Sequence, residues 1–204
     1  MSEMALRHWE GIYESKKTDE VSWFQSEPML SLRLIESVAR KDSAIVEIGA
    51  GNSFLSKGLL DRKFTDITVL DISKHALDLL ESQLGDRAIQ IERIEADVLE
   101  WQPQRSFDIW HDRAVFHFLI SPDDQEKYLE LTKRAVKKGG YLILGTFALD
   151  GPEKCSGLDT ARYDGAALQS LFSDGFTLLS SEREAHITPS GSVQNFTWVI
   201  MQRT

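Results

Sequence analysis

Short runs of aliphatic and β-branched residues alternate with helical patterns through the middle of the chain. The runs typical of buried strands occupy residues 44–48, 67–70, 89–94, 107–110 and 141–147. This alternation is the sequence mark of βαβ units, in which successive strands lie parallel in one sheet. We therefore predict an α/β fold that is doubly wound, with helices on both faces of the sheet.

Capping residues mark where the intervening helices begin and end. Ser73 is placed to cap a helix that carries leucines at helical spacing, and Gly85 fits the end of that helix. Ser121 followed by Pro122 is a strong helix start, and the Lys-Lys-Gly run at 137–139 fits the corresponding stop. These signals predict one helix before the third strand and another before the fifth.

The pattern changes after the fifth strand. A short helix is predicted over 164–172, followed by strands over 176–183 and 193–202. The Thr-Pro-Ser-Gly segment at 188–191 joins the two strands as a turn, which predicts an antiparallel hairpin at the C-terminal edge of the sheet. Two further helical patterns, over 5–15 and 28–39, precede the first strand.

Composition and charge exclude several classes of protein. Hydrophobic residues make up 42% of the 204 residues, which is enough to build a core and excludes a disordered chain. A net charge of −9 argues against nucleic acid or an anionic membrane as a partner, because no cationic surface would attract either. The single Cys155 forms no internal disulfide, and no secretory signal is evident, so we expect a cytoplasmic protein.

A glycine loop follows the first predicted strand and precedes a helix. Gly49 and Gly51 stand where the backbone can approach a ligand closely. Asp71 lies 20 residues beyond Gly51, at the end of the second strand, where an acid can bind both hydroxyls of a ribose. Asp97 ends the third strand in the same way. Because the carboxyl ends of parallel strands share one edge of the sheet, these groups predict a ligand-binding crevice there.

Two residues around the loop restrict the ligand. Phe54 occupies the position of the third glycine in the dinucleotide fingerprint, so an NAD-dependent reductase is a disfavoured alternative. Glu47 would repel phosphate groups but suits a cationic ligand. No phosphate-binding loop of the G-x-x-x-x-G-K-[ST] type is present. A sulfonium cofactor with an adenosine and an amino-acid tail fits the three acids.

Four segments resemble the motifs of the class I S-adenosylmethionine (SAM)-dependent methyltransferases, in the family's order. The resemblance implies a seven-stranded, mostly parallel sheet of Rossmann-like type, and SAM as the cofactor. Ser53 departs from the third glycine that many members carry. The four segments are Glu47-Ile-Gly49-Ala-Gly51, Val69-Leu-Asp71-Ile-Ser73, Glu95-Ala-Asp97-Val98 and Phe107-Asp-Ile-Trp-His-Asp-Arg113.

By this resemblance the cofactor-binding residues can be assigned. The two loop glycines would pass the methionine tail, Asp71 would hold the ribose, and Asp97 with Val98 would face the adenine. The resemblance also implies a lid over the cofactor at residues 1–40, a cofactor-binding core at 41–150 and a sheet edge at 151–204, all in one domain. The candidate cofactor residues are Trp23, Glu47, Gly49, Ala50, Gly51, Asn52, Asp71, Ile72, Asp97, Val98 and Arg113.

The end of the fourth strand provides candidates for the methyl-transfer site. Its Asp-Ile-Trp-His-Asp-Arg-Ala segment resembles thiopurine methyltransferase and its relatives, in which the matching arginine helps enclose the cofactor. Each candidate also has a structural interpretation: a hydrogen-bonded histidine, a helix cap at Asp112, or a solvated hairpin around His186. The candidate catalytic residues are His111, Asp112, His117 and His186.

The sequence thus predicts an enzyme that transfers a methyl group from SAM to a sulfur, nitrogen or oxygen nucleophile. It favours a small-molecule acceptor over a protein. A protein lysine methyltransferase is the alternative, because the lysine methyltransferases that modify elongation factors carry an Asp-Lys-Gly sequence at a similar position. A non-catalytic module that binds SAM or its product is the alternative from another class. Histidine spacing predicts no metal site.

Overall fold

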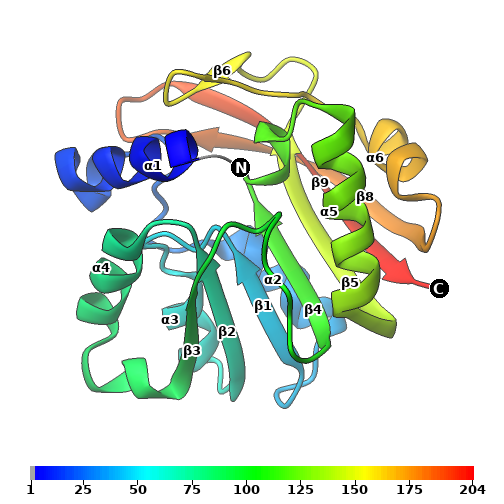
Figure 1. Ribbon diagram of the computed structural model, residues 1–204, viewed down its shortest axis with the longest axis horizontal. Coiled ribbons are helices and arrows are strands. Elements are labelled where there is room, and N and C mark those ends of the chain that lie inside the picture. The colour runs from blue at the N-terminus through cyan, green and yellow to red at the C-terminus, as the bar shows by residue number, and fades with distance from the viewer. Residues whose placement is uncertain (1–2) are drawn as a thin grey trace.

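A computed structural model describes residues 3–204 and contains a seven-stranded sheet in the order β3-β2-β1-β4-β5-β9-β8 (Figure 1). The first five of these strands are parallel, and β9 runs antiparallel to both of its neighbours. This confirms the predicted fold. The strands are β1 Ala44–Ile48, β2 Asp66–Asp71, β3 Ile91–Glu95, β4 Phe107–Arg113, β5 Val136–Phe147, β8 Phe176–Ile187 and β9 Val193–Arg203.

Helices cover both faces of the sheet, as predicted. The helices α2, α3 and α4 pack on one face, α5 and α6 pack on the other, and α1 lies near the carboxyl ends of β1 and β2 (Figure 1). No helix within residues 3–204 is long and apolar enough to span a bilayer. The helices are α1 Glu3–Ser15, α2 Met29–Val38, α3 Leu55–Asp61, α4 Lys74–Leu84, α5 Pro122–Ala135 and α6 Gly165–Phe172, with 3₁₀ turns η1 Thr18–Glu20, η2 Gly85–Gln90 and η3 Phe116–Phe118.

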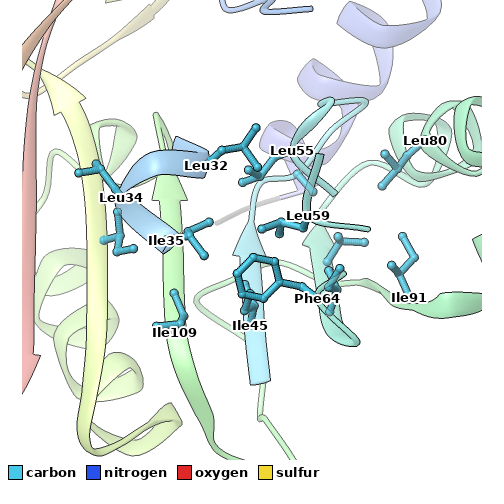
Figure 2. Close-up of a cluster of buried hydrophobic side chains, with 14 of the residues drawn as sticks. Leu32, Leu34, Ile35, Ile45, Leu55, Leu59, Phe64, Leu80, Ile91 and Ile109 are labelled. Atoms are coloured by element: carbon cyan, nitrogen blue, oxygen red, sulfur yellow. The ribbon is translucent and has the colours of Figure 1, made fainter. Parts of the chain in front are cut away.

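The two faces of the sheet carry alternate residues of each strand. On β1, Ile45 packs beneath α2 and α3, whereas Val46 and Ile48 pack beneath α5. Figure 2 shows the first cluster, in which Leu59 and Phe64 lie over Ile45. All of these side chains are buried. This alternation decides which side chains of each strand reach a given face at the edge of the sheet.

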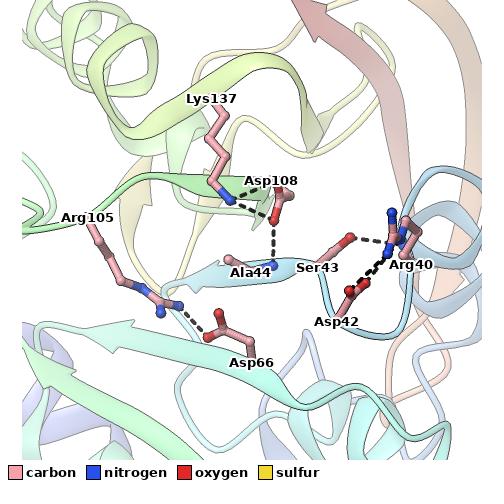
Figure 3. A network of polar contacts seen from close by, with 8 residues as sticks. All are labelled: Arg40, Asp42, Ser43, Ala44, Asp66, Arg105, Asp108 and Lys137. Carbon is pink, nitrogen blue, oxygen red and sulfur yellow. Dashed lines mark hydrogen bonds and ion pairs between the residues drawn. The ribbon is translucent and has the colours of Figure 1, made fainter.

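A polar network ties the amino ends of the strands together (Figure 3). The carboxylate of Asp108 accepts the backbone N–H of Ala44 at 2.8 Å and the Nζ of Lys137 at 3.0 Å. Arg105 pairs with Asp66 beside it. The network joins β1, β4 and β5 at the edge opposite their carboxyl ends, which leaves the carboxyl edge available for a binding site.

The helix caps are confirmed, but several element boundaries differ from the prediction. Ser73 and Ser121 each accept a backbone N–H from the first turn of their helices. The third strand starts later than predicted because the chain forms η2 first, which leaves Ile89 91% exposed. The helix α5 stops at Ala135, before the Lys-Lys-Gly run, because Val136 already pairs with Phe107 as the first residue of β5.

The region after β5 contains a hairpin that the sequence pattern did not predict. The strands β6 Lys154–Cys155 and β7 Leu158–Asp159 pair antiparallel, so Cys155 lies in a strand. Ser156 and Gly157 form the turn with positive φ angles of 49° and 84°. This hairpin brings Cys155 to the carboxyl edge of the sheet.

Candidate active site

Two pockets lie at the carboxyl ends of β1, β2 and β4, and we refer to the pair as the cavity. They share four lining residues, Trp23, Ile48, Gly49 and Arg113. We call the first the aromatic compartment. Its walls include Asp71, Ile72, Ala96, Val98, Phe118, Phe147, Cys155, Gln194 and Phe196, with Trp9 and Tyr13 above them. We call the second the polar compartment. Its walls include Ala50, Glu47, Asn52, Ser53, Ser31 and His111.

The glycine loop needs both of its glycines. Gly49 and Gly51 have φ angles of +61° and +52°, a region that residues with a Cβ rarely adopt. A Cβ on Gly49 would lie 2.1 Å from Val115 Cγ2, and one on Gly51 would lie 2.3 Å from the hydroxyl oxygen of Tyr13. The loop therefore packs directly beneath α1. Gly49 lines both compartments, whereas Tyr13 covers Gly51.

Asp71 fixes the geometry of two chain segments at the base of the cavity. One carboxylate oxygen accepts the N–H of Gly51 at 2.7 Å, and the other accepts the N–H of Ser73 at 2.8 Å. Burial raises the pKa of Asp71 to about 6, although both backbone bonds act in the opposite direction. Each oxygen keeps a second lone pair, so the carboxylate can still accept hydroxyl groups from a ligand in the aromatic compartment.

Glu47 is a buried acid in the polar compartment. Its carboxylate accepts the hydroxyls of Ser53 at 2.5 Å and Ser56 at 3.0 Å. Burial raises the pKa of Glu47 to about 7, and the two serine hydroxyls oppose this rise. A cation in the compartment would favour the ionised form, so the site suits an ammonium group.

Arg113 is a buried cation with unused hydrogen-bonding capacity. Its Nη1 donates to the carbonyl of Trp23 at 2.9 Å, and the guanidinium lies over the ring of Phe196 with a 5.0 Å separation. No group in residues 3–204 accepts a hydrogen bond from Nε or Nη2. Burial lowers the pKa of Arg113, which is the cost of holding this charge without a carboxylate. The free edge can bind an anionic group bidentately.

Strand alternation separates the neighbouring candidates of β4. His111 and Arg113 point to the α2–α3 face and reach the polar compartment. Asp112 points to the opposite face, where it accepts the hydroxyl of Tyr128 and the N–H groups of Val115 and Phe116. Asp112 therefore caps η3 from within the core, and the structure does not bring it to either compartment.

The other two candidate histidines also lie outside both compartments. His117 is fully buried, and its Nδ1 accepts the N–H of Phe147 at 3.3 Å. Burial lowers its pKa to about 3, so it stays neutral. His186 Nε2 donates to the carbonyl of Ser22 at 2.7 Å. Its cross-strand partner Gln194 lines the aromatic compartment.

Residues 18–25, which we call the strap, cross the mouth of the cavity. Its contacts come from three elements of the site. Asn52 of the glycine loop donates to Thr18 at 2.8 Å, Arg113 of β4 holds the carbonyl of Trp23, and His186 of β8 holds that of Ser22. At its end, Gln25 donates to Glu184 at 2.8 Å. Trp23 of the strap lines both compartments.

The remaining predicted cofactor residues follow the ends of β2 and β3. Ile72 and Val98 line the aromatic compartment beside Asp71. Asp97 does not line the compartment, and its carboxylate accepts the N–H of Leu99 at 2.9 Å. This bond fixes the turn that presents Val98.

Sequence reasoning missed much of the aromatic wall. Trp9 and Tyr13 stand four residues apart on α1, so they share one helix face, and this spacing was a usable signal. Phe147 and Phe196 pair across β5 and β9, with ring centroids 4.9 Å apart. Nothing in the local pattern of either strand indicated that these rings face a cavity.

An α/β sheet with a glycine loop after its first strand and an acid at the end of its second is the arrangement of many nucleotide-binding enzymes. Residues 45–140 match the sequence profile of the family described as "Methyltransferase domain". This match covers just under half of the chain, and together with the fold it agrees with the resemblance to the class I SAM-dependent methyltransferases.

Two human proteins named as methyltransferases are similar to this chain in sequence. The human eEF1A lysine and N-terminal methyltransferase is 24% identical over 140 residues, which cover 68% of this chain and 20% of that protein. The human EEF1A lysine methyltransferase 2 is 25% identical over 191 residues, covering 84% of this chain and 74% of that protein. The chain thus spans about a fifth of the first relative.

A solved structure shows the same fold. The 1,6-didemethyltoxoflavin-N1-methyltransferase of Burkholderia thailandensis, solved with 1,6-didemethyltoxoflavin and S-adenosylhomocysteine (SAH), superposes with a TM-score of 0.73. The alignment covers 98% of this chain and 89% of that one at 17% identity. At this identity the likeness supports the fold alone.

Proposed function

We propose that this protein transfers the methyl group of SAM to a nucleophile on a small-molecule acceptor. One observation carries the proposal: Arg113, two of whose nitrogens have no partner in residues 3–204, and Glu47, a buried acid, line the same compartment directly beside Gly49. A cation and an anion side by side suit a zwitterion, which is the form of the amino-acid tail of SAM. The ribose acid Asp71 lies on the other side of Gly49.

The remaining residues fit the same ligand. Asp71 accepts the ribose hydroxyls, and Ile72 with Val98 forms an apolar wall for the adenine, which Asp97 supports through its turn. Glu47 faces the ammonium group and Arg113 the carboxylate. The glycine loop lets the backbone approach the tail closely.

SAM supplies an activated methyl group on a sulfonium, so the protein mainly has to align the nucleophile and exclude water. Alignment of two reactants in one site removes as much as about 7–11 kcal/mol of the barrier. Trp23 and Trp9 cover the cavity, with ring centroids 6.0 Å apart. The strap therefore both excludes water and completes the wall against which an acceptor would lie.

The shape of the aromatic compartment supports a small-molecule acceptor. Beyond the nucleoside wall it continues between Phe118, Phe147 and Phe196, with Cys155 and Gln194 as the polar groups. Aromatic walls with a few polar groups are typical of sites that enclose small apolar molecules. A lysine side chain on a protein is the alternative acceptor, which the names of the two human relatives suggest.

Methyl transfer itself is tested with SAM carrying a labelled methyl group. The protein is incubated with labelled SAM and either a library of small aromatic and aliphatic nucleophiles or a mixture of basic proteins. Labelled small-molecule product supports the proposal, and label confined to protein lysines supports the alternative. Tight SAH binding without label transfer to either class would indicate a non-catalytic binding module.

We also infer a cytoplasmic location. The inference rests on the single cysteine, Cys155, which is buried as a free thiol. Fractionation of the native host, with this protein detected by antibody, tests it.

A further inference from the structure

His111 is a buried polar side chain that makes no hydrogen bond to the described part of the chain. Its exposed fraction is 2%, and neither ring nitrogen has a partner within residues 3–204. Buried polar groups in folded proteins are almost always bonded, and each one left unpaired is destabilising. An imidazole with both nitrogens unpaired, on the wall of a cavity, therefore indicates a ligand that supplies the missing partners.

The position of His111 identifies the part of the cavity that it serves. His111 and Glu47 are register partners on the adjacent strands β4 and β1. Arg113 follows two residues later on the same face of β4, and all three side chains line the polar compartment. His111 does not line the aromatic compartment, where an acceptor would lie. This placement separates it from the nucleophile and does not suit a catalytic base.

The protonation state of His111 defines what it can bind. Burial lowers its pKa to about 3, and the charge of Arg113 acts in the same direction. The ring is therefore neutral near pH 7, with one N–H donor and one bare nitrogen acceptor. The ring of Trp198 lies tilted by 37° against the imidazole, with centroids 5.8 Å apart.

We propose that His111 is a binding residue for the α-amino-acid head group of the cofactor, completing a three-residue site with Glu47 and Arg113. Its bare nitrogen accepts from the ammonium that Glu47 neutralises, and its N–H donates to the carboxylate that Arg113 binds. The inference rests on the proposed function, since it assigns a role toward the same cofactor. It makes His111 a determinant of specificity for ligands that carry both charges of the amino acid.

The test compares two ligands that differ in the head group. SAH carries the amino acid, whereas 5′-methylthioadenosine has the same nucleoside and sulfur without it. Affinities of both are measured by isothermal titration for the wild type, His111→Phe and His111→Gln. The Phe variant removes both nitrogens but keeps an aromatic ring against Trp198, and the Gln variant keeps a donor and an acceptor.

We expect His111→Phe to weaken SAH binding by about 10- to 100-fold, the effect of losing hydrogen bonds to charged groups, and to leave 5′-methylthioadenosine unchanged. His111→Gln should recover most of the loss. His117→Phe is the matched control, because His117 is equally buried with a pKa also near 3 but lies outside both compartments. It should bind SAH as the wild type does.

Equal weakening of both ligands would show that His111 only supports the fold of the site, and unchanged SAH binding would show that it contacts no head group. Either result overturns the inference. A wild-type protein that binds neither ligand would instead overturn the proposed function. If the Phe variant does not fold, the ¹⁵N shifts of His111 in the wild type decide: they should move on adding SAH but not on adding 5′-methylthioadenosine.

Discussion

The carboxylate of Asp71 accepts the backbone N–H of Gly51 at 2.7 Å, so the end of β2 fixes the loop that follows β1. The second oxygen of Asp71 holds Ser73, the cap of α4. One side chain therefore positions two of the elements that surround the proposed cofactor, and it still presents lone pairs to the aromatic compartment.

Replacement of Asp71 by Asn should weaken SAH binding by about 10- to 100-fold. The amide keeps the size of the carboxylate but loses one acceptor and the charge that strengthens its hydrogen bonds to the ribose hydroxyls. Isothermal titration checks this prediction. Asp78→Asn is the control, because Asp78 pairs with Lys74 on the exposed side of α4. Wild-type affinity in Asp71→Asn would exclude Asp71 from the cofactor site.

Glu47 links cofactor binding to pH. The ammonium of SAH favours the ionised carboxylate, and burial places the pKa of Glu47 at about 7 in the free protein. The affinity for SAH should therefore rise between pH 6 and pH 8 as Glu47 becomes ionised, with Asp71, whose pKa is about 6, adding to the rise at the lower end. Titrations across this range measure it. A flat profile in the wild type would contradict an ammonium at Glu47.

The same acid should reduce stability at neutral pH. The folded protein raises the pKa of Glu47 from 4.5 to about 7, so the unfolded chain loses this proton first as the pH rises, and stability falls between these values. Above pH 7 the cost approaches about 3 kcal/mol. Glu47→Gln should therefore raise the melting temperature by roughly 6–12 °C at pH 8, and much less at pH 4.5, while it weakens SAH binding. A melting temperature lower than that of the wild type at pH 8 would contradict this account.

Asp112 should behave as a structural residue. Its carboxylate accepts Tyr128 and two N–H groups of the η3 turn inside the core. Asp112→Ala leaves these donors unpaired, so we expect the free energy of unfolding to fall by about 3 kcal/mol, measured by urea denaturation. SAH affinity of the folded variant should stay within about threefold of the wild type, since such a change is under 1 kcal/mol. Full stability with lost turnover would instead support the catalytic role considered from the sequence.

His186 should act through the strap. Its hydrogen bond to the Ser22 carbonyl is one of the contacts that hold residues 18–25 over the cavity. His186→Ala should speed amide hydrogen exchange in residues 18–25 and lower the rate of methyl transfer, with SAH affinity little changed. His75→Ala, on α4 away from the strap, is the control. Unchanged exchange in the strap would remove His186 from this role.

The sequence pattern predicted the sheet and the glycine loop because both depend on local signals. The strand runs, the caps at Ser73 and Ser121 and the acid at the end of β2 are each contained within a few residues. The face of the sheet to which each side chain points was harder to predict. A strand covered by helices on both faces has no polar face, so its pattern does not reveal which of the neighbours His111 and Asp112 points to the α2–α3 side.

The aromatic wall depends on contacts between distant segments. Phe196 reaches the cavity only because β9 inserts antiparallel beside β5, and Cys155 only because the β6–β7 hairpin folds back over the edge. The hydrogen bonds from Arg113 and His186 to the strap carbonyls also depend on distant segments. Every residue has a backbone carbonyl, so no residue type indicates them. Such contacts follow from tertiary packing, and no residue type or spacing encodes them locally.

The central claim is that the cavity at the carboxyl edge binds SAM, and direct titration tests it. Isothermal titration of the wild type with SAM and SAH, with NADH as the comparison ligand, should show saturable binding of the first two at one site per chain and no binding of NADH. Saturable binding of NADH without binding of SAM or SAH would contradict the account.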